Sequence, residues 1–205
     1  MRWRSVATGT VLAAAMVYSG YLVRQSIHTD RIAQPKVVGQ RTTVTEGYLP
    51  GDMAPNFSLP ATGGKTMSLA SLRGHPVWLN FWATWCPHCR QELALIEKEH
   101  QRYGKGLIIV GIDMEQSRAQ VEAFVRARGL TYPTLLDTQG SVSAAFNVHG
   151  LPTSVFIAPN GIIKAVRAGA VTSPLEAQAY IDQIVSRSAQ SRRVGLMPAA
   201  AKLAK

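Results

Sequence analysis

The chain has 205 residues, of which 46% are hydrophobic and 17% charged, with a formal net charge of +10 and two cysteines. At about 150 residues per domain, this length predicts one domain with extensions, long enough to bury a core without disulfides. Two cysteines are too few for a disulfide scaffold or a four-cysteine zinc site, and the hydrophobic fraction argues against a disordered chain or a multi-span membrane protein.

The positive charge lies at the two ends of the chain. Residues 1–40 carry a net charge of +4 and residues 187–205 carry +5, whereas residues 41–186 carry only +1. A nucleic-acid-binding domain concentrates basic residues on its own folded surface. Because flanking charge is more typical of membrane topology or of a solvated tail, we expect no nucleic-acid partner.

The first residues have the pattern of a signal anchor. Arg2 and Arg4 precede an uncharged, largely apolar run over residues 5–23. As a helix this run would span about 28 Å, close to the hydrocarbon thickness of a bilayer. We therefore predict a membrane anchor over residues 1–24 and a linker over residues 25–49. A cleaved secretory signal is the alternative, since the same pattern opens exported proteins.

Strand and helix signals alternate through the middle of the chain. The first half predicts a short strand at Phe57–Leu59, a hairpin turn at Gly63-Gly64, a buried strand at Pro76–Ala83, and a helix from Pro87 to about Tyr103. The second half predicts a buried strand at Leu107–Ile112, a helix with a capping box at Ser117–Gln120 that ends near Gly129, a hairpin of Thr153–Ala158 with Ile162–Val166, and a helix from Ser173-Pro174 to about Ser188. This order predicts an α/β sandwich with a mixed sheet over residues 50–188, followed by a basic tail over residues 189–205.

Both cysteines, Cys86 and Cys89, lie where a predicted strand passes into a helix. Cys86 is expected at or just before the helix amino terminus, and Pro87 suits the first turn. Free backbone N–H groups and the helix dipole favour an anion there, so the pKa of the Cys86 thiol should fall below about 8.5. Cys89 lies one turn deeper. The spacing predicts a dithiol–disulfide exchanger with an exposed nucleophile and a shielded resolving thiol.

Other uses of a Cys-x-x-Cys pair stay open at this point. A metal site would need further ligands, for which His88 and His149 are the best candidates. Haem attachment requires a histidine directly after the second cysteine, where this chain has Arg90. A purely structural disulfide would not need a helix terminus.

The residues around the cysteines resemble a known family. Asn80–Cys89, with the sequence NFWATWCPHC, resembles the active site of the thioredoxin superfamily. Gly51–Leu59 and Leu69–Gly74 resemble the TlpA/ResA/DsbE branch, whose members are extracytoplasmic, membrane-tethered thiol–disulfide oxidoreductases. The resemblance covers roughly residues 50–187. It implies a thioredoxin-like three-layer sandwich with a central mixed sheet, preceded by one transmembrane helix.

The resemblance also implies a substrate-binding segment. Family members have a cis-proline that faces the active-site disulfide, and Gly150–Thr153 matches that position. A cis bond before Pro152 would leave the backbone of Leu151 free to pair with an extended substrate strand. Leu151 and Pro152 are therefore predicted to bind substrate. An ordinary trans proline entering a strand is the alternative.

At one position this chain differs from thioredoxin in a residue that takes part in proton transfer. Thioredoxin has a buried aspartate where this chain has Asn80, and an amide does not titrate. In the ResA-like branch the acid three places after the second cysteine is implicated, which implies that Glu92 accepts the proton of Cys89. The alternative is a solvated glutamate on the helix face.

The residues before and between the cysteines are expected to tune the site. Pro87-His88 is similar to the dipeptide of DsbA-type oxidants, and Trp85 precedes the first cysteine. A histidinium near Cys86 would stabilise the thiolate, and a stabilised reduced form makes the disulfide a stronger oxidant. We therefore expect a comparatively oxidising couple, unless His88 points into solvent.

The leading hypothesis is a thiol–disulfide oxidoreductase anchored in the inner membrane by residues 5–23, with its catalytic domain in the periplasm and no cofactor or metal. Its partners would be protein thiols or disulfides, with apocytochrome c thiols among the candidates, and a membrane or periplasmic redox partner. A soluble periplasmic form after signal cleavage is the alternative location.

Two other functions are weighed against this hypothesis. A peroxiredoxin-like peroxidase is one, because Gly51–Leu59 also resembles such sequences, although Ala83 stands where a peroxidase has threonine. The other is a non-enzymatic, tethered metal-binding module that uses Cys86, Cys89 and His149.

Overall fold

The computed structural model describes residues 45–185. The predicted membrane anchor over residues 1–24, most of the predicted linker, and the predicted basic tail over residues 189–205 lie outside the described residues. Within residues 45–185, no helix is both long and apolar enough to cross a membrane.

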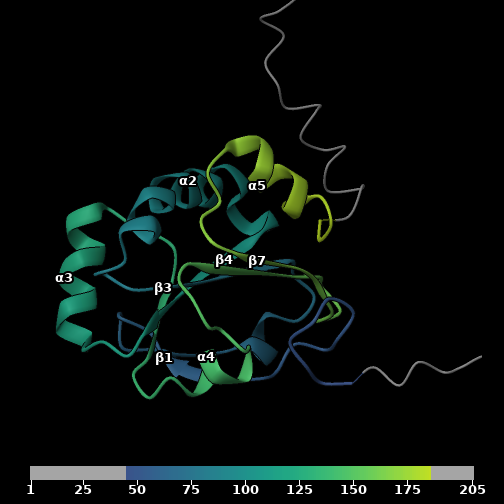
Figure 1. Ribbon diagram of the computed structural model, residues 1–205, viewed down its shortest axis with the longest axis horizontal. Helices are drawn as coiled ribbons and strands as arrows, with labels where there is room; N and C mark the ends of the chain where they lie inside the picture. Colours follow the sequence, from purple (N-terminus) through teal and green to yellow (C-terminus); the bar gives the residue numbers. More distant parts are fainter. Residues whose placement is uncertain (1–44, 186–205) are drawn as a thin grey trace, which may run out of the picture. The chain divides into compact units, whose positions relative to one another are not determined.

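A five-stranded mixed sheet forms the centre of the described domain (Figure 1). In spatial order the strands are β5 (Thr134–Asp137), β4 (Ile108–Met114), β3 (Val77–Trp82), β6 (Thr153–Ile157) and β7 (Ile163–Ala168). β3, β4 and β5 are parallel, whereas β6 runs antiparallel to both of its neighbours. The predicted mixed sheet is therefore confirmed. Helical crossovers join the parallel strands, and a hairpin joins β6 to β7.

The central strand β3 is buried on both faces, as its apolar sequence predicts. Because side chains alternate along a strand, Trp78, Asn80 and Trp82 face one side of the sheet, and Leu79 and Phe81 face the other. The two tryptophans belong to one hydrophobic cluster, and Leu79 and Phe81 belong to a second. Asn80 is thus a polar side chain within the layer of the tryptophans.

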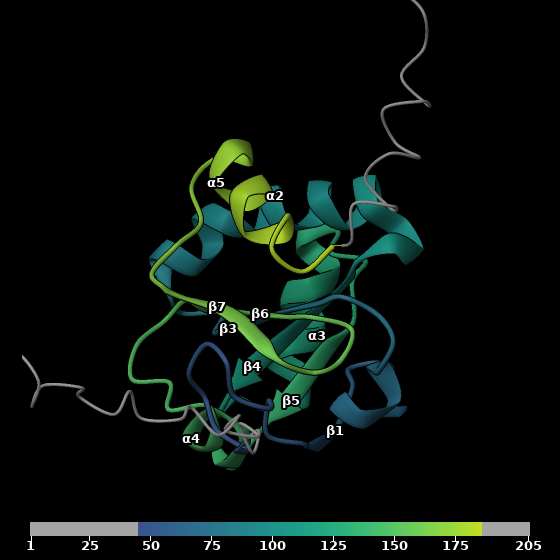
Figure 2. The ribbon, with the colours of Figure 1, turned by 90° about the vertical axis from the view of Figure 1, so that its right-hand side faces the viewer.

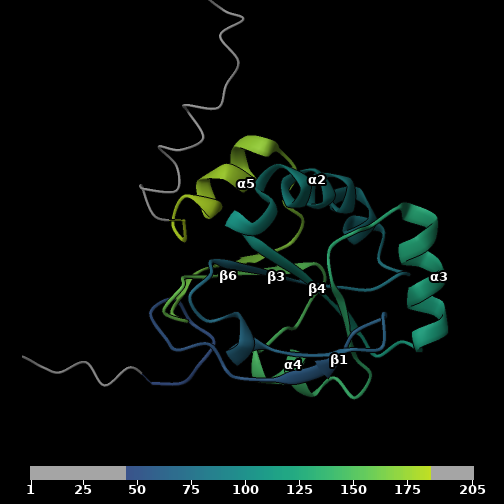
Figure 3. The same cartoon turned by 180° about the vertical axis from the view of Figure 1, so that it is seen from behind.

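Helices and a small hairpin cover the two faces of the sheet. Helices α2 (Pro87–Tyr103) and α5 (Pro174–Ile181) lie on the face that carries the tryptophans. Helix α4 (Ser141–Ala145) and the hairpin of β1 (Ser58–Pro60) with β2 (Thr66–Ser68) lie on the other face. Figures 1, 2 and 3 show this division from three sides. The predicted three layers are therefore present.

Helix α3 (Arg118–Arg128) connects β4 to β5 and begins with the predicted capping box. The hydroxyl of Ser117 accepts a hydrogen bond from the backbone N–H of Gln120, and Oε1 of Gln120 accepts one from the backbone N–H of Ser117. The helix ends at Gly129, whose φ of 63° is a left-handed conformation that glycine adopts without strain. Val121 attaches α3 to the same cluster as α2.

The structure differs from the predicted elements in several short segments. Helix α5 ends at Ile181 and not near Ser188, because the N–H groups of Gln183 and Ile184 bond three residues back and tighten the chain into a turn. This turn buries Ile184 in the core. The sequence does not predict β2, β5, α4 or the short 3-10 helices η1 (Leu69–Leu72) and η2 (Gly104–Gly106).

Candidate active site

The two cysteines form a disulfide at the junction of β3 and α2. Cys86 is the N-cap residue of α2, and Pro87 occupies the first turn, as predicted. Sγ of Cys86 accepts a hydrogen bond from the backbone N–H of Cys89 at 3.1 Å. A backbone N–H of the helix start therefore points at the sulfur that would carry negative charge after reduction.

The prediction of an exposed nucleophile is wrong for the disulfide form. The exposed fraction is 3% for Cys86 and 0% for Cys89, and both sulfurs belong to the hydrophobic cluster under α2. Leu151 packs against the same cluster and adds apolar surface near the cysteines. Both cysteines are therefore shielded from solvent in the disulfide form.

The residues flanking the cysteines lie at the surface. Trp85 has an exposed fraction of 63%, and its backbone oxygen accepts a hydrogen bond from Nη2 of Arg90 at 3.4 Å. His88 is exposed, and its Nδ1 lies 3.5 Å from Oε1 of Gln91. The structure thus places His88 on the solvent side of the helix start. This matches the alternative in which His88 points into solvent and is not held close to the sulfur of Cys86.

A groove of about 300 Å³ lies beside Trp85. It is lined by Trp85, Met114, Glu115, Val148, His149, Gly150 and Leu151. The Leu151–Pro152 peptide bond is cis, as the family resemblance implies. The backbone oxygen of Pro152 accepts a hydrogen bond from the N–H of Gly169 at 2.8 Å, which fixes this segment to the loop after β7. The exposed Trp85 and the predicted substrate-binding Leu151 therefore share one concave surface.

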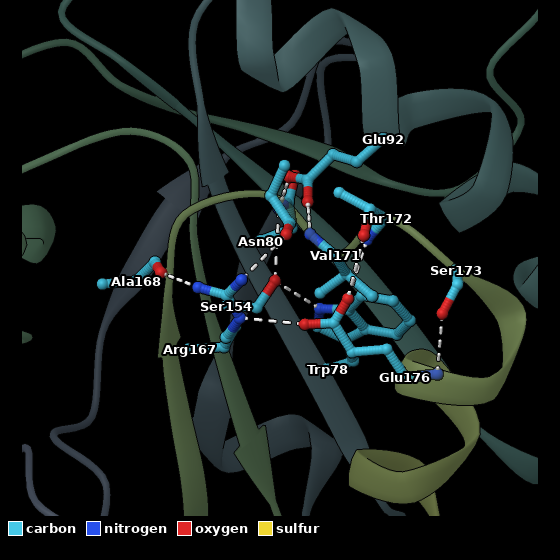
Figure 4. Close-up of polar contacts among 11 residues, drawn as sticks. Trp78, Asn80, Glu92, Ser154, Arg167, Ala168, Val171, Thr172, Ser173 and Glu176 are labelled. Atoms are coloured by element: carbon cyan, nitrogen blue, oxygen red, sulfur yellow. Dashed lines mark hydrogen bonds and ion pairs between the residues drawn. The ribbon is translucent and has the colours of Figure 1, made fainter.

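Glu92 is buried, with an exposed fraction of 1%, so the alternative of a solvated glutamate is wrong. Its Oε1 accepts a hydrogen bond from Nδ2 of Asn80 at 2.7 Å, and its Oε2 accepts one from the backbone N–H of Val171 at 2.8 Å. Figure 4 shows these contacts, together with the bond from Trp78 Nε1 to the hydroxyl of Ser154 at 2.8 Å. Glu92 lies three residues after Cys89, on the same side of α2.

Burial raises the pKa of Glu92 from 4.5 to about 7, because a charged carboxylate loses its hydration inside the protein. The N–H of Val171 and the amide of Asn80 oppose this effect, since both stabilise the carboxylate. A carboxyl group with a pKa near neutrality is suited to accept and release protons at physiological pH.

The sequence does not single out a second buried acid, Asp113, at the end of β4. Asp113 is fully buried beside Trp82, its register partner on β3. Neither carboxyl oxygen has a hydrogen-bond partner among the described residues. Burial raises its pKa from 3.8 to about 7, although the nearby backbone N–H of Gln116 partly opposes the shift. The feature of the sequence that could have identified Asp113 is a charged residue directly after a predicted apolar strand.

Gln116 itself fastens the loop before the cysteines. Its Oε1 accepts a hydrogen bond from the backbone N–H of Thr84 at 2.6 Å, and its Nε2 donates to the hydroxyl of Thr84 at 2.8 Å. Gln116 lies beyond the predicted end of its strand, so no periodic signal identified it. The two bonds fix the segment from β3 to Cys86 against the end of β4.

The metal-binding alternative receives no support from the described part of the chain. Within it, no group of three or more histidine, cysteine, aspartate or glutamate side chains is arranged to hold a metal ion. Cys86 and Cys89 are bonded to each other.

The arrangement is that of a thioredoxin-like disulfide oxidoreductase: a disulfide at a helix start and a cis-proline directly before β6, on a mixed sheet between two layers. The chain belongs to the AhpC/TSA family, which matches residues 50–166.

Named relatives place the chain more narrowly within thioredoxin-like proteins. It is 39% identical over 129 residues to the thioredoxin-like protein YneN of Bacillus subtilis (strain 168), covering 62% of this chain and 75% of that protein. It is 35% identical over 131 residues to the thiol-disulfide oxidoreductase ResA of the same organism, covering 63% and 73%. The predicted resemblance to ResA is therefore confirmed.

Solved structures agree with this assignment. A thiol:disulfide interchange protein of the thioredoxin family from Chlorobium tepidum TLS has a TM-score of 0.60 at 29% identity, over 69% of this chain and 99% of that chain. A secreted disulfide oxidoreductase of Mycobacterium tuberculosis, homologous to Escherichia coli DsbE, has a TM-score of 0.56 at 27% identity, over 61% and 93%. The predicted thioredoxin-like fold is thus confirmed for the described domain.

Proposed function

We propose that the protein exchanges disulfides with protein substrates through Cys86 and Cys89. The Cys86 thiolate attacks a substrate disulfide, forms a mixed disulfide, and releases one substrate thiolate. Cys89 then attacks Sγ of Cys86, releases the second substrate thiolate, and restores the Cys86–Cys89 disulfide. Two electrons pass to the substrate, and the same steps in reverse oxidise a substrate dithiol. The observation that carries the proposal is the disulfide at the N-cap of α2.

Glu92 is proposed to take the proton that Cys89 releases when it becomes a thiolate. The buried position of Glu92 on the same side of α2, and its pKa of about 7, support this role. At neutral pH a substantial fraction of Glu92 is ionised and able to accept a proton. The proton can return to Cys89 when the disulfide is reduced again.

Substrates are proposed to bind along the groove beside Trp85. Its lining includes Leu151 and Trp85, the residue directly before Cys86, which supports this assignment for Leu151. The cis bond before Pro152 supports it for Pro152. An extended segment there could pair with the backbone of Leu151 while its sulfur reaches Cys86. Pro87 and His88 are proposed to adjust the stability of the thiolate, with His88 acting through solvent-exposed charge.

The location of the protein is also a proposal. Residues 1–24 would anchor it in the inner membrane, residues 25–49 would form a linker, and residues 50–188 would work in the periplasm before a basic tail at 189–205. The apolar run over residues 5–23 supports the anchor. Substrates would then be extracytoplasmic thiol proteins, apocytochromes c among them, with a membrane or periplasmic partner that recycles the cysteines.

The test compares the full chain with Cys86→Ser and Cys89→Ser in turnover of a protein disulfide such as insulin. We expect Cys86→Ser to fall to the uncatalysed rate, because it lacks the attacking sulfur. Cys89→Ser should form a mixed disulfide that does not resolve. Wild-type turnover in Cys86→Ser would contradict the proposal, and rapid consumption of hydrogen peroxide would favour the peroxidase alternative instead.

The trapped complex also tests the proposed location. In cells, Cys89→Ser should accumulate bonded through Cys86 to exported proteins. The control is the double variant with Cys86→Ser, which has no sulfur to retain a partner. Capture of cytoplasmic proteins alone would contradict the periplasmic assignment.

A further inference from the structure

Asn80 lies in a buried row of polar side chains that ends at Glu92. It stands directly opposite Ser154 in the antiparallel register of β3 with β6, and Trp78 is two residues away on the same face of β3. Trp78, Asn80 and Ser154 each have an exposed fraction of 0%. The register itself therefore brings these three side chains together under α2, as Figure 4 shows.

Each hydrogen bond in this row has a defined donor and acceptor. The hydroxyl oxygen of Ser154 accepts from Trp78 Nε1 at 2.8 Å and from Nδ2 of Asn80 at 3.4 Å. The same Nδ2 donates to Oε1 of Glu92 at 2.7 Å. Nδ2 of Asn80 thus lies between two acceptors, and a donor, not the amide oxygen, faces the carboxylate. Two polar contacts fix an amide in a buried site far better than packing alone.

We propose that Asn80, oriented by Ser154 and Trp78, is a positioning residue that holds Glu92 and stabilises its carboxylate during disulfide exchange. The inference rests on the proposed role of Glu92 as the proton acceptor for Cys89. A buried carboxylate with no donors would remain protonated at neutral pH and would have no capacity for a second proton. Asn80 and the N–H of Val171 each supply one donor to one oxygen.

Other charged groups act on Glu92 from the neighbouring elements. Arg167 on β7 stabilises the carboxylate, and Glu176 on α5 opposes it. The two are joined by an ion pair at 2.9 Å, so their effects on Glu92 largely offset each other. The charge of Glu92 in turn contributes to the raised pKa of Tyr132, whose shift is caused mainly by burial. Substitution of Asn80 or Ser154 changes none of these side chains themselves, so the experiment is directed at the amide.

The experiment follows the titration of the Glu92 carboxyl carbon by NMR in the oxidised full-length protein. Asn80→Leu removes the donor at similar volume, and we expect the titration midpoint to rise above 7 by about one pH unit. Asn80→Asp should also raise it, because two buried acids then share the site. Ser154→Ala should cause a smaller rise, since the amide remains but loses its anchor.

Ser143→Ala is the matched control for Ser154→Ala. Ser143 is also a buried serine with a hydrogen-bonded hydroxyl, but it lies on α4 and donates to Asp137 at 2.8 Å on the other side of the sheet. The Ser143→Ala variant should be less stable than wild type, but the titration midpoint of Glu92 should not change. An unchanged midpoint in Asn80→Leu, with only a loss of stability, would overturn the inference.

A kinetic readout separates this inference from the proposed function. In the resolving step, Cys89 attacks the mixed disulfide and releases the substrate thiolate. The midpoint of the pH profile of this step should move to higher pH in Asn80→Leu, by the same amount as the NMR titration midpoint of Glu92. If Glu92→Gln leaves that pH profile unchanged, the proposed role of Glu92 fails. If Glu92→Gln changes the profile but Asn80→Leu changes neither measurement, the positioning role of Asn80 alone fails.

Discussion

Two buried acids with different surroundings lie on the same side of the sheet, and the comparison shows how local contacts decide their roles. Glu92 has a hydrogen-bond donor on each oxygen, whereas Asp113 forms no hydrogen bond of normal geometry within the described residues and only the nearby N–H of Gln116 favours its charge. Burial raises the pKa of both to about 7. Because both pKa values are raised, ionisation of either acid opposes folding, and Glu92 differs from Asp113 in the two donors that hold its carboxylate.

Substitution of Asp113 tests this difference. A pKa raised from 3.8 to about 7 means that the carboxyl favours the folded state at low pH, and that this contribution is lost as the pH rises through 7. Asp113→Asn removes the ionisation. Relative to wild type, its free energy of unfolding should therefore rise by about 3 kcal/mol between about pH 4 and about pH 8. Urea unfolding of the oxidised protein at both pH values measures this change.

Asp137→Asn provides a contrasting control for Asp113→Asn. Asp137 accepts hydrogen bonds from the backbone and hydroxyl groups at the start of α4, including both groups of Ser143 at 2.8 Å. Removing this acceptor charge should destabilise the protein at about pH 8. If Asp113→Asn behaved in the same way, the account of Asp113 as an unsupported buried acid would be contradicted.

At the residue level, the sequence identifies side chains that belong to a motif and misses those that depend on tertiary contacts. Cys86, Cys89 and Pro87 follow from spacing and from the helix start. Ser154 acts through cross-strand contacts with Asn80 and Trp78 on β3, and Val171 acts through a backbone N–H. Neither role leaves a trace in composition or periodicity, so a sequence alone does not reveal them.

At the level of elements, α3 depends on its capping box for a well-defined start. Ser117→Ala removes the hydroxyl that accepts the N–H of Gln120, and should lower the free energy of unfolding by about 1 kcal/mol. Ser117→Thr keeps the acceptor and should retain most of the stability. Disulfide exchange should stay at the wild-type rate in both variants. Equal stability of wild type and Ser117→Ala in urea unfolding would argue against a stabilising cap.

The elements that the sequence predicts well are long or carry strong end signals. β3 has a largely apolar run, and α3 has a capping box with a terminal glycine. The missed elements are short and depend on neighbours: β5 has only four residues and pairs with β4, and α4 has five residues capped by Asp137 of β5. Local patterns over so few residues do not distinguish a strand or a helix from a loop.

At the level of the whole molecule, the sheet and α2 together determine the chemistry of the site. β3 delivers Cys86 to the first turn of α2, the Pro152 segment precedes β6, and the loop after β7 bonds to both Pro152 and Glu92. The loop after β7 therefore joins the cis-proline segment to the helix that carries the cysteines. Family membership supports the general chemistry, while the proposed substrate site is the groove beside Trp85.

The central claim is that the start of α2 makes the Cys86 sulfur an acidic, reactive thiol. The most direct measurement is the pKa of the Cys86 thiol in reduced Cys89→Ser protein, followed by the ultraviolet absorbance of the thiolate as the pH rises. We predict a midpoint at least about one unit below the free value of about 8.5. A midpoint at or above about 8.5 would contradict the account.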